Sequence, residues 1–188
     1  MRKFFVAWGI AFAILLAVGA VFFAVNFVLQ WQNNDQNNMI NTNDMRIASP
    51  SFENNDGFPP KFTCDGEETN PPLEFANIPR KARSLALVLR DPDAPSGTFI
   101  HWILWNIDPA TETVKSGELL AGARQGKTTN GKVEYVGPCP PSGTHRYIFT
   151  LYALDAKLYL NEGADIEQFE GAISGHVLET AQIMAKYR

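Results

Sequence analysis

The chain has 188 residues, of which 45% are hydrophobic, 12% aromatic and 19% charged. This composition excludes a wholly disordered or collagen-like polypeptide and fits one globular domain with attached segments. The formal net charge is -4, from 16 Lys and Arg against 20 Asp and Glu. Because such a chain lacks an excess of basic residues to hold polyanions, we expect no nucleic-acid partner.

Residues 4–29 form an uninterrupted run without charge. A helix of this length, rising about 1.5 Å per residue, would span a bilayer with some tilt. Arg2 and Lys3 precede the run and no cation follows it until Arg46, so the positive-inside rule predicts a cytoplasmic N-terminus and an extracytoplasmic C-terminal part. We therefore expect residues 1–29 to be a single-pass N-terminal membrane anchor.

A cleaved signal peptide is the alternative for the same segment. Val18-Gly19-Ala20 offers a small-residue cleavage site, and cleavage there would give a secreted protein. However, the apolar core of a signal peptide is only about 7 to 15 residues long, and this run is longer. The uncleaved anchor is therefore the preferred interpretation.

Residues 30–46 are rich in Asn and Gln and poor in apolar side chains. Such a segment has little apolar surface to offset the entropy of ordering its backbone, so it is typical of a flexible linker. Residues 47–188 remain for the folded domain, and their number is sufficient to bury a substantial core.

Strand patterns dominate residues 47–188. The strongest segments are 85–90, 99–107 and 146–154, which are rich in aliphatic and aromatic residues, and 133–136 is a weaker fourth. In residues 100–105 both alternate sets of side chains are largely apolar, so we expect both faces of that strand to be covered.

Helical periodicity comes late in the chain. Asp165 and Gln168 have the spacing of a capping box, and Gly171 and Gly175 are expected to interrupt the helix. The apolar residues that recur at helical intervals are Ile166, Phe169, Ile173, Val177 and Met184. Because no helical stretch separates the central strands, the order of elements favours a mostly β sandwich with peripheral helices, in which loops build any binding site.

Two stiff loops flank the strongest strands. Residues 91–97, Asp-Pro-Asp-Ala-Pro-Ser-Gly, lead to His101, and residues 137–143, Gly-Pro-Cys-Pro-Pro-Ser-Gly, lead to His145 and Tyr147. Prolines fix φ and remove N–H donors, whereas glycines permit tight turns and the close approach of a ligand to the backbone. Such loops can hold a small pocket in its final shape.

These motifs resemble the phosphatidylethanolamine-binding protein family, also called Raf kinase inhibitor proteins, and in particular its bacterial and archaeal branch. The motifs concerned are Asp91-Pro-Asp-Ala-Pro, His101-Trp-Ile-Leu-Trp-Asn106, and Gly137-Pro-Cys-Pro-Pro followed by Gly143-Thr-His-Arg-Tyr147. The resemblance extends over residues 47–188. It implies an antiparallel Greek-key β-sandwich with a small anion-binding pocket at one end, which family members use for phosphate-bearing head groups.

The residues that match the family pocket are Asp91, His101, Gly137 through its backbone, Pro140, Pro141, His145 and Tyr147. Imidazoles, a phenol and backbone N–H groups can surround phosphate oxygens as directed donors. Asp91 would repel a dianion, so we expect it to fix the tautomer of a histidine or to meet an ammonium group or a protonated phosphate oxygen. By strand alternation Arg146 points to the other face, where an ion pair is expected.

Cys64 and Cys139 are the only cysteines of the chain. In an extracytoplasmic domain they could form a disulfide that closes a long loop, or they could remain two free thiols beside the pocket. The sequence does not give the distance between them, so both interpretations stay open.

The sequence therefore predicts a membrane-tethered module that binds a small phosphorylated or other anionic ligand, needs no cofactor, and could regulate a protein partner through the occupied pocket. The alternative is a hydrolase or metal-dependent enzyme that uses Asp91, His101 and His145, with Ser96 or Ser142 nearby. No Gly-x-Ser-x-Gly motif supports a hydrolase, and no His-x-x-x-His spacing supports a metal site. Binding without catalysis is the preferred interpretation.

Overall fold

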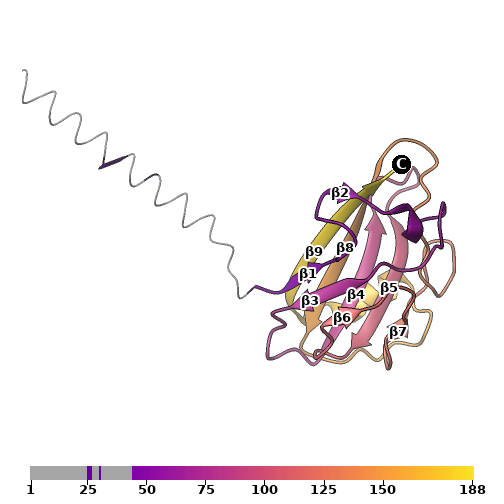
Figure 1. The fold of residues 1–188 in the computed structure, drawn as a ribbon. Coiled ribbons are helices and arrows are strands. Elements are labelled where there is room, and N and C mark those ends of the chain that lie inside the picture. The colour runs from indigo at the N-terminus through magenta and orange to yellow at the C-terminus, as the bar shows by residue number, and fades with distance from the viewer. Residues whose placement is uncertain (1–24, 27–29, 31–43) are drawn as a thin grey trace, which may run out of the picture. The chain divides into compact units, whose positions relative to one another are not determined.

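The computed structural model describes residues 25–26, 30 and 44–188 (Figure 1). The predicted membrane anchor and linker lie almost entirely outside these residues. Among the residues that are described, no helix is long and apolar enough to cross a membrane. The first strand begins at Arg46, the last residue of the segment expected to be a linker.

The described part of the chain is mostly β and contains two sheets. The larger has the strand order β2-β9-β8-β4-β5-β7, and the smaller has the order β1-β3-β6. The elements are β1 (Arg46–Ala48), β2 (Asp56–Gly57), the 3-10 helix η1 (Pro60–Phe62), β3 (Leu73–Ala76), β4 (Ser84–Asp91), β5 (Phe99–Ile107), β6 (Thr113–Val114), β7 (Arg124–Gln125), β8 (His145–Leu154), α2 (Ile166–Ile173) and β9 (Val177–Tyr187).

Most neighbouring strands pair antiparallel, as expected, but β2 and β9 pair in parallel through Asp56 and Gly57. The prediction of a wholly antiparallel sandwich is wrong at this short edge. The expected peripheral helices are represented, among the described residues, by α2 and the single turn η1.

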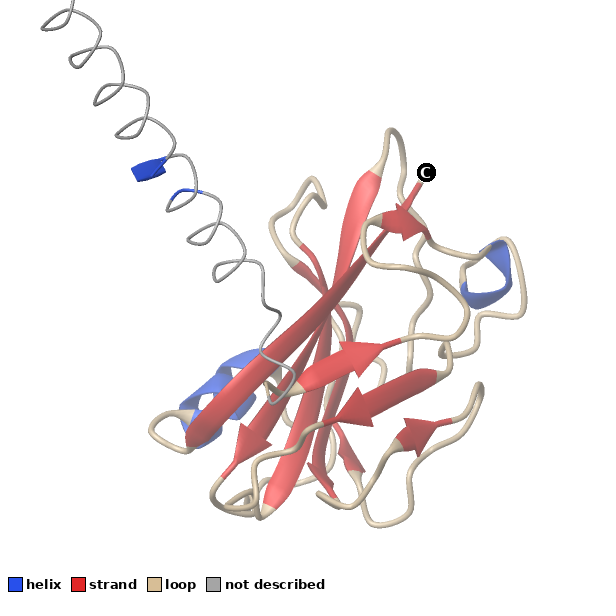
Figure 2. Ribbon diagram, turned by 60° about the vertical axis from the view of Figure 1, so that its left-hand side comes forward, coloured by secondary structure: helices blue, strands red, loops and turns tan. Residues whose placement is uncertain are grey.

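Strand β4 shows why the large sheet is covered on both faces. Its odd-numbered residues Leu85, Leu87 and Leu89 belong to a buried cluster shared with the smaller sheet, whereas Ala86 and Val88 belong to a second cluster shared with α2. Side chains alternate between the two faces of a strand, so a run that is apolar at both parities must be covered on both. Figure 2 shows the strands and α2 that form these layers.

The central strands predicted from the sequence are confirmed, with small changes at their ends. Strand β4 extends over residues 84–91, and β8 over residues 145–154. The large side chains of β5 fill both cores, because Trp102 lies in the cluster facing the smaller sheet and Trp105 lies in the cluster facing α2. The weaker strand predicted at 133–136 is wrong, because these residues form a loop.

The late helix is shorter than its apolar periodicity predicts. Its capping box is present, since Gln168 N–H donates to Asp165 Oδ1 at 2.9 Å and Asp165 N–H donates to Gln168 Oε1 at 3.0 Å. The helix ends at Ile173, and Gly175 follows with φ of 80° in the left-handed region. Val177 and Met184 lie in strand β9, because pairing along almost the whole of β8 stabilises an extended chain there.

Candidate functional site

The two proline-rich loops meet at one end of the large sheet. Strand β4 is antiparallel to both β5 and β8, with Asp91 opposite Phe99 and Arg90 opposite Ile148. The last residue of β4 therefore lies beside the first residues of its two neighbours. Strand topology thus brings together residues that are more than 50 positions apart in the sequence.

A pocket of about 350 Å³ lies at this end, and all seven predicted site residues line it. Its lining residues are Asp91, Ala94, Pro95, Ser96, Gly97, Thr98, Phe99, His101, Thr129, Asn130, Val136, Gly137, Cys139, Pro140, Pro141, His145 and Tyr147. The buried residues of this lining include Asp91, His101, His145 and Tyr147.

Asp91 and His145 form a buried pair across the ends of β4 and β8. His145 Nδ1 lies 2.7 Å from Asp91 Oδ2, and the exposed fractions of the two side chains are 8% and 4%. A carboxylate accepts but does not donate, so it fixes the proton on Nδ1 and leaves Nε2 as the second ring nitrogen. The other oxygen, Asp91 Oδ1, accepts from the backbone N–H of Asp93 at 2.8 Å, which holds the loop that follows β4.

His101 is oriented by the backbone of Val136. Its Nδ1 donates to the Val136 carbonyl oxygen at 2.8 Å, and the Val136 N–H donates back to the His101 carbonyl oxygen at 3.0 Å. Burial disfavours the imidazolium form and lowers the pKa of His101 below its ordinary value of 6.5. The ring is therefore neutral near pH 7, and its Nε2 is a hydrogen-bond acceptor.

Tyr147 supplies a buried donor. Its ring packs edge-on against the ring of His101, with centroids 5.3 Å apart. Burial, and then the charge of Asp91, raise the pKa of the phenol, so the hydroxyl keeps its proton. Neither this hydroxyl nor Trp105 Nε1 has a hydrogen-bond partner within the described part of the chain, and of the two only Tyr147 lines the pocket.

Gly137 does not offer its amide to the pocket as the sequence suggested. Its N–H donates to Glu68 Oε1 at 3.3 Å. A Cβ at this position would lie 2.9 Å from the Phe62 carbonyl oxygen and 3.0 Å from Thr63 Cα. Glycine is therefore needed here for the close approach of two backbones. Gly137 also lines the pocket, and its role in binding stays a prediction.

Cys64 and Cys139 are joined by a disulfide, with Cα atoms 5.5 Å apart. Cys139 lies between Pro138 and Pro140, and both Cys139 and Pro140 line the pocket. The disulfide therefore connects the wall of the pocket to the segment that follows η1.

Sequence reasoning missed the contribution of Thr129 and Asn130, which line the pocket from the loop after β7. Thr129 Oγ1 accepts from the backbone N–H of Ile100 at 2.8 Å, which fastens this loop to β5. The Asn130-Gly131 dipeptide is a turn signal. However, a turn signal does not reveal which distant strand the turn will contact.

Arg146 makes the expected ion pair outside the pocket. Its guanidinium donates to both carboxylate oxygens of Asp93, at 2.8 and 2.7 Å. These hydrogen bonds lower the pKa of Asp93 to about 2. The pair ties the 91–97 loop to β8 and so supports the mouth of the pocket.

The groups needed by the two enzyme alternatives are only partly assembled. Ser96 lines the pocket, but among the described residues it forms no hydrogen bond with either pocket histidine. No set of three or more His, Cys, Asp or Glu within residues 25–26, 30 and 44–188 is arranged to hold a metal ion.

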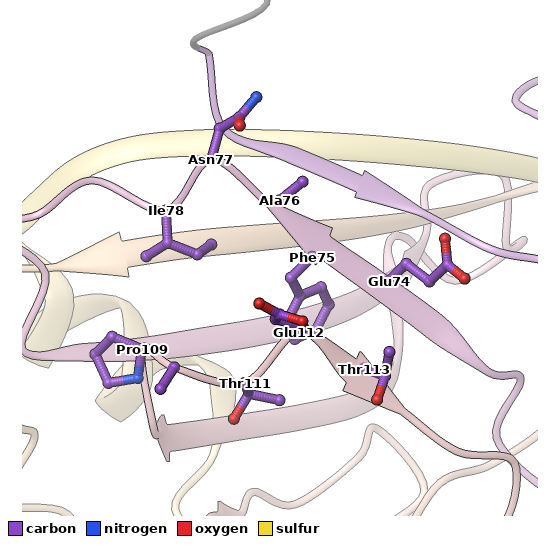
Figure 3. A pocket seen from close by; sticks show the side chains of 10 residues that line it. Glu74, Phe75, Ala76, Asn77, Ile78, Pro109, Thr111, Glu112 and Thr113 are labelled. Carbon is purple, nitrogen blue, oxygen red and sulfur yellow. The ribbon is translucent and has the colours of Figure 1, made fainter.

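A second hollow, of about 520 Å³, lies between β3 and the loop that precedes β6 (Figure 3). Its lining includes Glu74, Asn77, Pro109 and Glu112, and none of the predicted site residues. Phe75 is buried beneath it, and the Phe75 N–H donates to the Glu112 carbonyl oxygen at 2.8 Å. The hollow contains neither histidine nor a cation, so it lacks the donor set of the first pocket.

Comparison with known proteins gives consistent results. The family described as "Phosphatidylethanolamine-binding protein" matches residues 48–188. A UPF0098 protein of Methanothermobacter thermautotrophicus is 43% identical over 149 residues, which cover 77% of this chain and 99% of that protein. A UPF0098 protein of Chlamydia trachomatis is 40% identical over 148 residues, covering 76% of this chain and 98% of the relative.

Two solved structures share the fold. The crystal structure of CT736 from C. trachomatis, a homologue of phosphatidylethanolamine-binding protein, has a TM-score of 0.75 and 40% identity, and the match covers 78% of this chain and 98% of that one. E. coli YbcL, described as a member of the mammalian family, has a TM-score of 0.72 at 24% identity, covering 77% of this chain and 98% of that one. The second likeness concerns the fold alone.

Proposed function

The chain belongs to the phosphatidylethanolamine-binding protein family, and we propose that its pocket at the ends of β4, β5 and β8 binds a small phosphorylated or other anionic ligand of the phospholipid head-group type. The family supports a ligand-binding module in general. The anionic class of ligand is our inference from the chemistry of the pocket.

The observation that carries the proposal is the Tyr147 hydroxyl. A buried hydroxyl without a partner forgoes a hydrogen bond worth about 1 to 3 kcal/mol, so its neighbourhood favours a ligand that brings an acceptor oxygen. A phosphoryl or carboxylate oxygen placed against Tyr147 would accept this proton. In a volume of about 350 Å³ there is room for a head group but not for a whole lipid.

The charges of the pocket favour a ligand with both donors and acceptors. Asp91 and His145 form a hydrogen-bonded pair, while neutral His101 presents Nε2 as an acceptor. A dianion alone would place negatively charged oxygens against this acceptor nitrogen, which is unfavourable. A protonated phosphate, or a head group with an ammonium group, could donate to His101 while its oxygens accept from Tyr147.

The proposal extends to the position of the module in the cell. Residues 4–29 have the length and the flanking charges of a membrane anchor, so the domain would be tethered on the extracytoplasmic side, close to a supply of lipid head groups. A protein partner that recognises the occupied pocket is part of the same proposal.

Isothermal titration of the full-length protein with phosphoethanolamine tests the ligand class. We expect binding by the wild type and by Asp155→Asn, which alters an exposed Asp–His pair of the same kind, and loss of binding by Asp91→Asn. Equal affinities of the two variants would contradict the assignment of the pocket.

A further inference from the structure

The wall of the pocket formed by residues 136–141 has few backbone anchors. It contains no helix or strand, and three of its six residues are prolines, which have no N–H to donate. Val136 is fastened by its two hydrogen bonds to His101. Beyond that residue, the wall must be held by something other than a strand ladder.

The segment 62–68 provides the attachment. Four links connect it to the wall and to the residue before the wall. Cys64 forms the disulfide with Cys139, and its N–H donates to the Pro138 carbonyl oxygen at 3.1 Å. In addition, the Gly137 N–H donates to Glu68 Oε1 at 3.3 Å, and the Tyr135 hydroxyl donates to the Phe62 carbonyl oxygen at 2.7 Å. Two segments about 75 residues apart in the sequence are thereby joined.

Glu68 has a backbone conformation that indicates a constraint. Its φ is 54°, in the left-handed region that a residue with a side chain adopts only at a cost. In this conformation its carboxylate reaches the Gly137 amide. The close backbone approach at Gly137 leaves no room for a Cβ, so the two segments are in direct contact at this point.

The wall also controls a ligand-facing side chain. The Val136 carbonyl oxygen accepts from His101 Nδ1 and thereby directs Nε2, while Pro140 lines the cavity. A movement of the wall would therefore change both the shape of the pocket and the orientation of the His101 ring.

We propose that segment 62–68 is a redox-sensitive clamp, in which the Cys64–Cys139 disulfide and the Glu68 carboxylate position the pocket wall, and that opening the disulfide weakens ligand binding. The proposal rests on the proposed binding function. Glu68 and the two cysteines are positioning residues, because they act through the wall on His101.

The disulfide is accessible to a reductant, since both cysteines are exposed at the surface of the domain. A small dithiol would open it by thiolate attack on one sulfur, which gives a mixed disulfide and releases the other cysteine as a thiolate that takes up a proton. The second thiol of the reagent then displaces the remaining cysteine. The products are two protein thiols and the cyclic disulfide of the reagent, so electrons and protons balance.

The first test uses the full-length protein, oxidised and after treatment with dithiothreitol, with circular dichroism to show that both forms are folded. The expected result on reduction is an affinity for phosphoethanolamine about tenfold weaker, corresponding to a pocket that is in its competent shape about one tenth of the time. The ring signals of His101 should shift, while those of exposed His176 stay unchanged. A folded, reduced protein with unchanged affinity and unchanged His101 signals would overturn the proposal.

A second test leaves the disulfide intact, in case its opening unfolds the chain. Glu68→Ala should weaken binding and shift the His101 signals, Glu68→Gln should restore both because its amide oxygen still accepts from Gly137, and the control Glu67→Ala should resemble the wild type. Equal behaviour of Glu68→Ala and Glu67→Ala would contradict the clamp.

The two proposals can fail separately. If the oxidised wild type binds no phosphoethanolamine, the proposed function fails. In that case the His101 signals on reduction still decide whether the clamp positions the wall, and unchanged signals would overturn it.

Discussion

Two Asp–His pairs in this protein have almost the same contact geometry and very different surroundings. His145 Nδ1 lies 2.7 Å from Asp91, and His176 Nδ1 lies 2.8 Å from Asp155. The first pair is 4% to 8% exposed and faces a pocket, whereas the second is 47% to 49% exposed at the turn before β9. A hydrogen-bonded Asp–His pair therefore does not by itself mark a binding site in this fold.

Burial decides what each pair can do. In water an exposed ion pair contributes about 0 to 1 kcal/mol, because solvent screens the charges and both side chains lose conformational freedom. Removing one partner of a buried pair leaves the other without compensation and typically costs about 3 to 5 kcal/mol. The buried pair also offers a ligand an imidazole whose orientation is fixed by Asp91.

The largest difference between the pairs should appear on truncation of the carboxylate. Asp91→Ala removes the partner of His145 and the acceptor for the Asp93 N–H, so we expect it to lower the free energy of unfolding by about 3 kcal/mol. Asp155→Ala should change it by less than about 0.5 kcal/mol. Urea denaturation at pH 7 compares the two, and similar losses would show that burial does not distinguish them.

Tyr147→Phe sharpens the comparison by separating binding from stability. The hydroxyl has no hydrogen-bond partner among the described residues, so its removal should leave the free energy of unfolding unchanged or raise it by up to about 1 kcal/mol. Ligand affinity should fall about tenfold, the effect of one lost hydrogen bond. Titration calorimetry and urea denaturation measure the two quantities. A destabilised variant with intact affinity would assign the hydroxyl a structural role.

The pH dependence of stability tests the burial of His101. Its pKa is lowered in the folded state, so below about pH 6.5 the unfolded chain binds a proton that the folded chain does not, and stability falls as pH decreases through that range. We expect the fall between pH 7.5 and 5.5 to be smaller in His101→Gln, by at most about 1.4 kcal/mol per pH unit. Urea denaturation of both proteins across this pH range measures the fall in stability. Equal slopes of stability against pH for the wild type and His101→Gln would contradict a buried neutral ring.

The smallest effect is expected at the exposed histidine. His176→Gln removes the partner of Asp155 at a solvated turn, so affinity for phosphoethanolamine should not change and the free energy of unfolding should change by less than about 0.5 kcal/mol. Calorimetry and urea denaturation again give both values. A large loss of affinity would place this second pair in the binding function.

Local patterns were sufficient to predict the central strands, whereas the set of pocket residues was predicted from the family resemblance. Strands β4, β5 and β8 are apolar over nearly their whole length, so their burial on both faces could be inferred without coordinates. The two proline-rich loops follow or precede these strands directly. Because both residues match the pocket of the family, Asp91 and His145 were expected at the same end of the sandwich.

Long-range contacts explain what was predicted incorrectly or missed. Val177 and Met184 have helical spacing, but pairing with β8 keeps them in a strand. Glycine is required at position 137 because the backbone there closely approaches residues 62–68, and Thr129 is held at the pocket by its hydrogen bond to β5. Neither contact leaves a signal in the neighbouring sequence. The parallel pairing of the two-residue strand β2 with β9 is likewise a tertiary contact.

The most direct test of the account is an NMR titration of the full-length protein with phosphoethanolamine. The chain has three histidines, so three sets of ring signals report on the two pocket rings and on one exposed reference. We predict that the signals of His101 and His145 shift together with a single dissociation constant while those of His176 remain in place. Stationary signals from both pocket rings, or an equal shift of all three, would contradict a ligand site enclosed by Asp91, His101, His145 and Tyr147.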